Sequence, residues 1–315
     1  MLKRGLLWGI CIFNMVAIGV TIFIVFRPYL RPKNPPPEFM VPSAQTTLGD
    51  WKTGLEQATD LHQVQTALAQ IPNDEPSAMW LEDRIKFGLS DVRIQSDAFY
   101  LDRLLAVISR WGQFLAYGDS GTRHLQEIIE DKSQPILVRT VSLQTLAEAV
   151  FRHGKADSDS ITKGDAPSPQ WQDDWKMFLT GLVSMASGTG LQGQTLALMD
   201  ASQQQGLCQW SQDEWSGMLP HLLQADSAAD ESSVIVALSI APVRLPPDEV
   251  RPYVRRLVDN TRSEALKSAA INTLAQIAND SDKRWLATYS AESVRISQAL
   301  WAARARLTLP QPAVQ

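Results

Sequence analysis

The sequence predicts an all-α protein in which one N-terminal transmembrane helix is followed by an array of helical hairpins. Three observations support this prediction. An uncharged apolar run fills residues 5–26, apolar residues recur at three- and four-residue steps over most of 47–307, and no stretch shows the sustained alternation of a strand. Hydrophobic residues make up 44% of the chain and charged residues 20%, as in ordinary folded proteins.

The run 5–26 is long enough to span a bilayer, because about 22 helical residues rise roughly 33 Å against a hydrocarbon core of about 30 Å. No small-residue cleavage site follows it promptly, which favours an uncleaved signal-anchor over a cleaved signal peptide or a buried soluble helix. Basic residues flank both ends, so the positive-inside count is nearly balanced. The charged head, 1–4, favours a cytoplasmic N-terminus. We therefore expect a single-pass protein of the bacterial inner membrane with its large domain in the periplasm.

A proline-dense spacer is predicted at 27–46, where proline fixes the backbone and removes hydrogen-bond donors. Its proline-dense part, 27–42, has roughly 16 residues, and in an extended polyproline-like form at ~3.1 Å per residue it can hold a domain up to ~50 Å from the membrane. A polar stretch rich in helix breakers, 154–170, predicts a loop between two helical subdomains, 47–153 and 171–307. Residues 308–315 are predicted to form a tail.

Helices are predicted wherever apolar spacing continues. Pro72 ends the first, Ser96 or Asp97 caps a long apolar one, and Gly118 ends that helix. The segments with helical spacing are 60–72, 77–89, 96–118, 171–186, 191–205, 211–223, 232–241, 247–260, 263–280 and 291–307.

One helical segment recurs along the chain. Residues 131–150 align with 259–278, and the triplet Thr-Leu-Ala stands at 145–147 in the first copy and at 273–275 in the second. A weaker third copy lies within 291–307. Such self-similarity is typical of repeat architectures, in which one helical unit stacks on the next.

The repeated segments resemble the second helix of a HEAT repeat. VRTVSLQTL (138–146) and LKSAAINTL (266–274) match its pattern of a basic residue after an apolar one and then small and apolar residues ending in Leu, whereas VRISQALWA (294–302) lacks the final Leu. The resemblance implies an α-solenoid with a binding surface and no catalytic site. It also suggests that the basic residue, Arg139 or Lys267, reaches the Asp at the turn of an adjacent repeat.

Charge is distributed unevenly along the chain. The net charge is −5, although no acid precedes Glu38 and residues 251–306 contain ten basic and five acidic residues. The net negative charge of the chain argues against a nucleic-acid partner, because binding nucleic acid requires a basic surface that neutralises phosphates. At the basic end, Arg251, Arg255 and Arg256 form the sharpest cluster. They are interpreted either as a patch for an acidic partner or anionic lipid, or as solvated helix charge.

No residue pattern predicts catalysis, a cofactor or a metal. GTGLQG at 188–193 matches a dinucleotide-binding string, but the segment before it has helical rather than strand spacing, which predicts a corner between two helices. The four histidines are scattered along the chain. The cysteine at 11 lies in the apolar run and the one at 208 in the polar domain, so no disulfide between them is expected.

Ten tryptophans are present, and two interpretations remain open for them. Trp171 and Trp175 lie one helical turn apart, and Trp210 and Trp215 flank a predicted helix start. They either wedge helical hairpins together or form an aromatic platform that grips a partner or a sugar.

These observations favour a membrane-anchored helical-repeat protein that recruits a protein partner and is not an enzyme. The possible partner-binding residues are Arg251, Arg255, Arg256, Trp171 and Trp175. The alternative is a cell-envelope enzyme or glycan-binding protein that gathers tryptophans and acids in a helical groove. A third possibility is lipid docking by the basic end.

Overall fold

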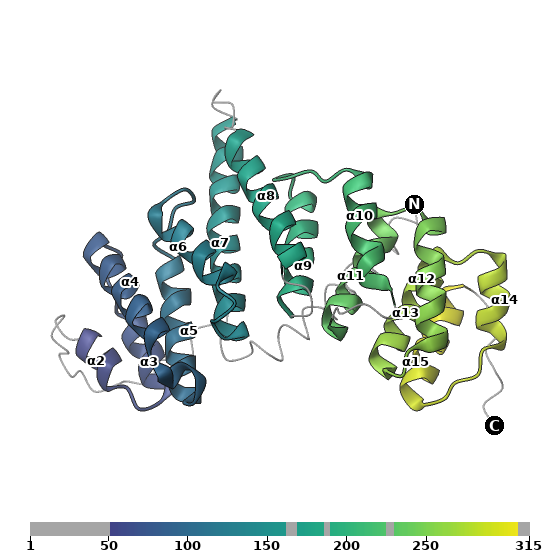
Figure 1. Cartoon of the computed structure of the whole chain (residues 1–315), viewed down its shortest axis with the longest axis horizontal. Coiled ribbons are helices and arrows are strands. Elements are labelled where there is room, and N and C mark those ends of the chain that lie inside the picture. Colours follow the sequence, from purple (N-terminus) through teal and green to yellow (C-terminus); the bar gives the residue numbers. More distant parts are fainter. Residues whose placement is uncertain (1–50, 162–168, 186–189, 225–229, 308–315) are drawn as a thin grey trace, which may run out of the picture. The chain divides into compact units, whose positions relative to one another are not determined.

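A computed structural model describes residues 51–161, 169–185, 190–224 and 230–307 of the chain (Figure 1). Within these ranges the chain forms 14 α-helices and one short 3-10 helix, η1, and no strand, which confirms the all-α prediction. The predicted head, membrane span and spacer, together 1–46, and the predicted tail at 308–315 lie outside the described residues. None of the described helices is long and apolar enough to cross a membrane.

The helices follow one another at short intervals, and most of them coincide with a predicted segment. Their bounds are α2 Trp51–Gln57, α3 Leu61–Ala69, α4 Glu75–Ser90, η1 Val92–Gln95, α5 Ala98–Gly112, α6 Ser120–Glu130, α7 Ile136–Ile161, α8 Pro169–Met185, α9 Gly190–Gln204, α10 Gln212–Leu223, α11 Glu231–Arg244, α12 Pro247–Asn260, α13 Glu264–Ile277, α14 Asp280–Thr288 and α15 Val294–Arg306.

Packing alternates between two rows of helices. The odd-numbered helices from α3 to α15 each contact the next odd-numbered helix, and every even-numbered helix from α4 to α14 packs against the odd-numbered helix that follows it. The chain thus runs as successive antiparallel hairpins, each resting on the previous one (Figure 1). Each hairpin buries its apolar stripe against its neighbours, because one hairpin alone has too little apolar surface to form a core.

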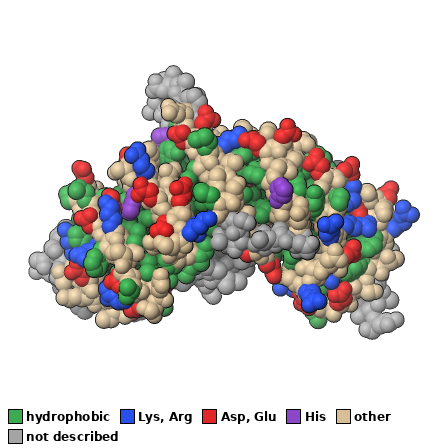
Figure 2. Space-filling view, in the orientation of Figure 1, with side chains coloured by type: hydrophobic (Ala, Val, Ile, Leu, Met, Phe, Trp, Pro, Cys, Tyr) green, Lys and Arg blue, Asp and Glu red, His purple; other side chains and the backbone are tan. Residues whose placement is uncertain are grey.

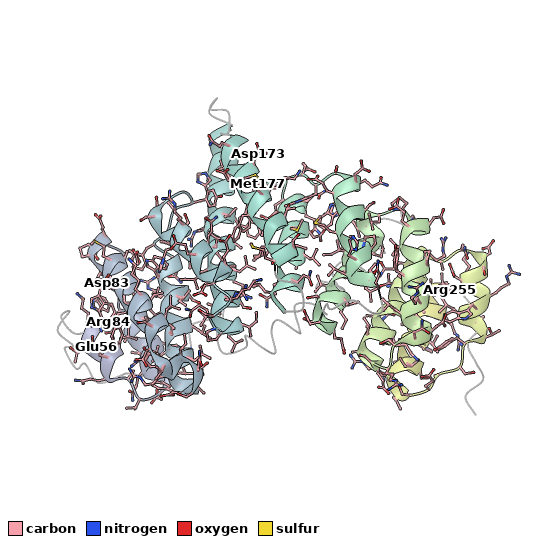
Figure 3. All side chains as sticks on the ribbon, viewed as in Figure 1. Glu56, Asp83, Arg84, Asp173, Met177 and Arg255 are labelled. Atoms are coloured by element: carbon pink, nitrogen blue, oxygen red, sulfur yellow. The ribbon has the colours of Figure 1, made fainter. Side chains whose placement is uncertain are left out.

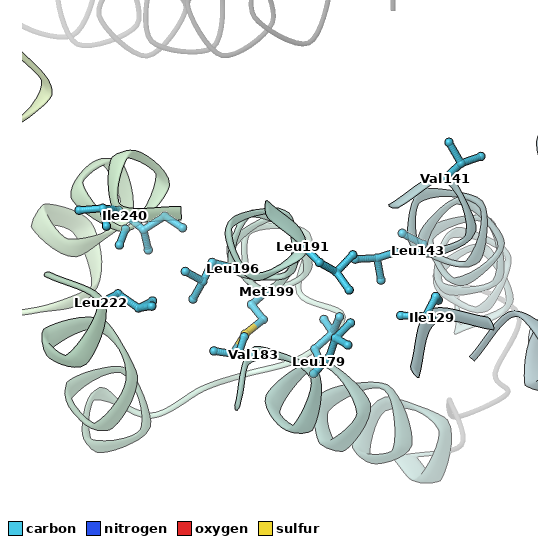
Figure 4. Close-up of a cluster of buried hydrophobic side chains, with 14 of the residues drawn as sticks. Ile129, Val141, Leu143, Leu179, Val183, Leu191, Leu196, Met199, Leu222 and Ile240 are labelled. Carbon is cyan, nitrogen blue, oxygen red and sulfur yellow. The ribbon is translucent and has the colours of Figure 1, made fainter. Parts of the chain in front are cut away.

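One apolar core connects all the hairpins, from Leu55 to Ala303. Its middle section is shown in Figure 4, where Leu143 on α7 and Leu191 on α9 extend toward each other and Met199 meets the side chains of α8. Both predicted subdomains contribute to this core, and Trp51–Gln315 forms one compact unit.

The two segments that repeat in sequence also repeat in burial. Over 143–149 in α7 and 271–277 in α13, buried, half-buried and exposed positions occur in the same order at all aligned positions. In both segments the residue aligned with the basic position of the pattern, Arg139 or Lys267, is buried as well. The third copy departs from this order, because Trp301 is 63% exposed where Thr273 is buried.

The basic residues of these repeats have different partners. Lys267 Nζ lies 2.9 Å from a carboxylate oxygen of Glu292, in the turn before α15, a glutamate where the resemblance suggests an aspartate. The guanidinium of Arg139 instead donates to the backbone carbonyl of Ile129, at 2.7 Å, near the end of α6. An unpaired carbonyl at a helix end needs a donor, and Arg139 supplies one inside the core.

Two predicted boundaries need correction. Asp97 caps α5 as predicted and accepts from the backbone N–H of Tyr100 at 3.1 Å, but the helix ends at Gly112 instead of Gly118. Arg152 of α7 donates to the carbonyl of Gly112 at 2.6 Å, which satisfies this earlier end. Gly118 adopts φ +96° in the following turn, a conformation that glycine tolerates best.

The second correction concerns the loop predicted at 154–170. Helix α7 continues to Ile161, and α8 begins at Pro169. Gly154 does not break α7, because its missing side chain lets Leu207 approach: a Cβ there would lie 2.3 Å from Leu207 Cδ2. The sequence after Gly154 contains no proline before Pro167, so no proline interrupts α7 up to Ile161.

The glycine string at 188–193 lies where one helix follows another, as predicted. Helix α8 ends at Met185 and α9 begins at Gly190. Gly193 serves packing: a Cβ there would lie 2.8 Å from the Cα of Ser233, because α9 and α11 approach closely at this point.

Candidate functional site

Two of the three arginines predicted as a cluster on α12, Arg251 and Arg255, form ion pairs within the fold. Arg251 Nε lies 2.8 Å from one carboxylate oxygen of Asp282, and Arg255 NH2 lies 2.6 Å from the other. Asp282 is fully buried at the start of α14, where it also accepts from the backbone N–H of Asn279. Arg251 additionally donates to the carbonyl of Ile277 at 3.0 Å. These contacts bind α12 to α14.

Arg251 and Arg255 thus have a partner inside the fold, which weakens the prediction that this cluster faces another molecule. Both arginines share the buried carboxylate of Asp282, and Arg251 also pairs with the exposed carboxylate of Asp248 on its own helix. These ion pairs reduce the contribution of the two arginines to the electrostatic potential at the surface. Arg255 also lies over the ring of Trp285, 5.0 Å from its centroid. Arg256, one residue further on, is exposed and remains available to solvent. The face drawn in Figure 2 shows acidic and basic side chains interspersed.

The tryptophans predicted as a platform are buried between helices. Trp171 and Trp175 on α8 are 8% and 0% exposed, and Trp210 and Trp215 are similarly enclosed. Three of their indole N–H groups donate to polar side chains of neighbouring helices: Trp175 to Ser202 at 3.1 Å, Trp210 to Thr180 at 3.1 Å and Trp215 to Gln203 at 3.0 Å. Trp171 and Trp175 are therefore core residues, which corrects their prediction as partner-binding residues.

A different part of the described surface combines exposed aromatic and basic side chains. Helices α2, α4 and α5, with η1, enclose a hollow of about 230 Å³, which we call the arginine groove. Gly88 lets α4 approach α5 closely, since a Cβ there would lie 2.8 Å from Leu104 Cδ1. The lining residues are Leu55, Glu56, Trp80, Arg84, Phe87, Gly88, Arg93, Tyr100, Arg103, Leu104 and Val107.

Each arginine of the groove lies over an aromatic ring. The guanidinium carbon of Arg84 lies 4.8 Å from the ring centroid of Trp80. Those of Arg93 and Arg103 lie 4.4 Å and 5.2 Å from the centroid of Tyr100. Such cation–π contacts hold a guanidinium by its flat face and leave its N–H edges available for hydrogen bonds.

The carboxylates near the groove pair with only some of these arginines. Glu56 of α2 forms an ion pair with Arg84 of α4, and both side chains are about half exposed (Figure 3). Asp91 forms a forked pair with Arg93, with its oxygens 3.1 Å from Nε and 2.6 Å from NH2. Hydrogen bonds from the side chain and the backbone N–H of Arg93 lower the pKa of Asp91 to about 2. Within the described ranges, Arg103 has no carboxylate at ion-pair distance.

Exposed apolar side chains adjoin the charged ones. Phe87 lines the groove and is 60% exposed, and Met79, on the same helix, is also exposed. Leu104 also lines the groove and is buried. The groove can thus contact both a charged and an apolar group on one ligand.

No group of histidine, cysteine and carboxylate side chains within the described ranges is arranged to hold a metal ion. Cys208 is buried, its Sγ donates to the carbonyl of Gln172 at 3.3 Å, and burial raises the pKa of its thiol to about 11. A thiol in this state is a poor nucleophile.

Comparison of the chain with protein-family models, with curated proteins and with solved structures finds no match.

Sequence reasoning missed the arginine groove, although its residues carry a signal. Trp80, Arg84 and Phe87 recur at four- and three-residue steps along α4, opposite the apolar residues of the core. The third arginine comes from α5 and the paired carboxylate from α2, so the cluster exists only after the helices pack.

Proposed function

We propose that this chain is a membrane-anchored helical-repeat protein of the α-solenoid type that recruits a partner protein. The packing of successive hairpins supports the proposal, because such arrays present long continuous surfaces and few enclosed cavities. The matching burial of α7 and α13 supports a HEAT-like repeat. In this proposal residues 5–26 anchor the chain, 27–46 act as a spacer, and the array lies in the periplasm of a bacterial cell.

The arginine groove is the observation that carries the proposal. Aromatic and arginine side chains are the residue types that most often dominate the energy of protein interfaces. Here Trp80, Tyr100 and Phe87 lie together with three arginines on adjoining elements. We assign this groove, and not the basic residues of α12, as the surface that a partner contacts.

The burial of the tryptophans argues against the alternative of an envelope enzyme or glycan-binding protein. That alternative required the tryptophans to line an open groove, and Trp171, Trp175, Trp210 and Trp215 are buried. Lipid docking by the basic end is also less favoured, because Arg251 and Arg255 already share the buried carboxylate of Asp282.

Crosslinking in the native membrane tests the proposed function. The full-length chain is crosslinked in intact cells, extracted in mild detergent and purified, and the co-purifying proteins are quantified. The proposal predicts one protein in near-stoichiometric amount. Recovery of the chain alone, over a range of crosslinker lengths, would contradict it. A reporter fused to the C-terminus of the same chain tests the predicted periplasmic location.

A further inference from the structure

We infer that the arginine groove binds an acidic peptide segment of the partner, with carboxylates on Arg103 and Arg84 and an apolar side chain beside Phe87. This inference rests on the proposed recruiting function and names the chemistry of what is recruited. It is carried by the charge, the geometry and the size of the groove.

The charge of the lining is complementary to an acidic ligand. The groove is lined by three guanidinium groups, on Arg84, Arg93 and Arg103, and by one carboxylate, on Glu56. Asp91 holds Arg93 in a forked pair beside the groove. The charge of Arg103 therefore remains uncompensated by any carboxylate of the described ranges.

The geometry of the arginines suits a carboxylate that accepts two hydrogen bonds from one guanidinium. Arg93 and Arg103 both lie over Tyr100, a buried ring, so their orientation is largely set before a ligand arrives. A planar guanidinium presents two parallel N–H groups, which match the two oxygens of a carboxylate. Side chains ordered in advance lose less conformational entropy on binding, which raises affinity.

The size of the groove favours a peptide side chain over a whole cofactor. A hollow of about 230 Å³ is smaller than small-molecule sites, which typically occupy ~300–1,000 Å³. The exposed ring of Phe87 and the buried side chain of Leu104 offer apolar contact to one aliphatic or aromatic residue. A segment with carboxylates on either side of such a residue satisfies both parts of the groove.

The surroundings disfavour a broad polyanion such as nucleic acid or an anionic membrane. Asp83, next to Arg84, is exposed (Figure 3). Asp97, which caps the start of α5, is exposed as well. Extended polyanions are bound by wide basic surfaces, and these carboxylates would repel them. A peptide can place its few carboxylates only where the arginines are.

Glu56 has a particular role in this arrangement. It pairs with Arg84 at the edge of the groove, so a ligand carboxylate must compete with it. Both side chains are about half exposed, so the pair contributes little to stability and exchanges readily. Replacing Glu56 by glutamine removes the competitor and should strengthen binding.

Selection from a random peptide library tests the inference and does not require the partner to be identified first. The full-length chain, purified in detergent, is immobilised, and a displayed library of unbiased composition is enriched on it. Enriched peptides are then synthesised, labelled and titrated by fluorescence anisotropy against the unaltered chain and the variants Arg103→Gln, Glu56→Gln and Arg256→Gln. Circular dichroism shows whether each variant is folded.

The inference predicts peptides rich in Asp and Glu around an apolar residue. Arg103→Gln should weaken their binding about tenfold or more, since a charge-assisted pair is lost. Glu56→Gln should strengthen binding about two- to fivefold, a gain that misfolding cannot produce. Arg256→Gln, a matched change at an exposed arginine outside the groove, should change binding less than about twofold.

Several outcomes would overturn the inference. Neutral or basic peptides, acidic peptides whose binding depends on Arg256 but not Arg103, or no enrichment at all would each do so. If crosslinking in cells still captures a stoichiometric partner in those cases, the recruiting function stands and only the acidic-peptide chemistry fails. If enriched peptides behave as predicted but no cellular partner is captured, the proposed function fails instead.

Discussion

Arginines gather in two regions of this molecule, and their carboxylate partners differ in exposure. At α12–α14, Arg251 and Arg255 share Asp282, which is fully buried. In the arginine groove, Arg84 pairs with the half-exposed Glu56, and Arg103 has no carboxylate partner in the described ranges. A buried carboxylate fixes its arginines as part of the fold, whereas an exposed one leaves them available to a ligand.

The same distinction applies to other arginines that serve the fold. Arg139 donates to the carbonyl of Ile129, Arg152 to that of Gly112, and Arg304 to that of Leu286, each near the end of a helix. These bonds satisfy helix-terminal carbonyls that have no partner within their own helix. Arg304 is one of the ten basic residues of 251–306, and a count of charges in the sequence does not distinguish such a residue from a member of a binding patch.

The largest expected effect comes from comparing a buried tryptophan with an exposed one. Trp175→Ala should lower the free energy of unfolding by about 3–5 kcal/mol, because it removes a fully buried ring that packs α8 on α9. The matched change Trp301→Ala, at a 63% exposed position, should alter it by less than about 0.5 kcal/mol. Chemical denaturation of both variants measures the difference, and similar values for the two would contradict the assignment of Trp175 to the core.

The second prediction compares the two carboxylate partners directly. Asp282→Asn should lower the free energy of unfolding by about 3 kcal/mol, since two arginines lose their buried counter-charge. Glu56→Gln should change it by about 0.5 kcal/mol or less, because its pair is exposed. Equal destabilisation by the two substitutions would remove the distinction between the regions.

The third prediction makes the same comparison from the arginine side. Arg255→Gln should lower the free energy of unfolding by about 1–2 kcal/mol, because Asp282 then retains only Arg251. Arg103→Gln should leave it unchanged within about 0.5 kcal/mol. Thermal unfolding of the two variants beside the unaltered chain measures this, and a marked loss in Arg103→Gln would assign that residue to the fold.

The smallest expected effect concerns pH. The pKa of Asp91 is lowered from 3.8 to about 2 by its bonds to Arg93, so the folded state holds this proton less tightly than the unfolded state does. The contribution of Asp91 to stability is therefore complete above about pH 4 and is lost as the pH falls toward 2. Asp91→Asn should reduce the melting temperature slightly at neutral pH and make its decline between pH 4 and 2 shallower. An unchanged decline would contradict the assigned pair.

Much of the fold follows from apolar spacing alone. Spacing and caps place most of the helices, and the bounds predicted for the helix at 247–260 are those of α12. The helices α2, α6 and α14 are not among the predicted segments, although Asn279 and Asp282 form a capping box that marks the start of α14. The extension of α7 past Gly154 depends on packing against Leu207, which the local sequence does not show.

The candidate site was less predictable than the fold, for a physical reason. Arg251 and Arg255 attracted attention because they stand four residues apart on one helix, but their partner Asp282 lies on another helix. No local pattern marks Arg84 and Arg103 as one site, because the groove forms only when α2, α4 and α5 pack. Local spacing identifies the face of a helix, whereas the role of that face depends on the helices that cover it.

Site-specific photo-crosslinking tests the central claim most directly. A photoreactive benzoylphenylalanine replaces Phe87 in the groove or, in a matched chain, Arg256 on α12, and cells producing either full-length chain are irradiated. The account predicts a discrete crosslinked protein from position 87 and none from position 256. A crosslink from position 256 alone would contradict it and return the binding surface to the basic end of the chain.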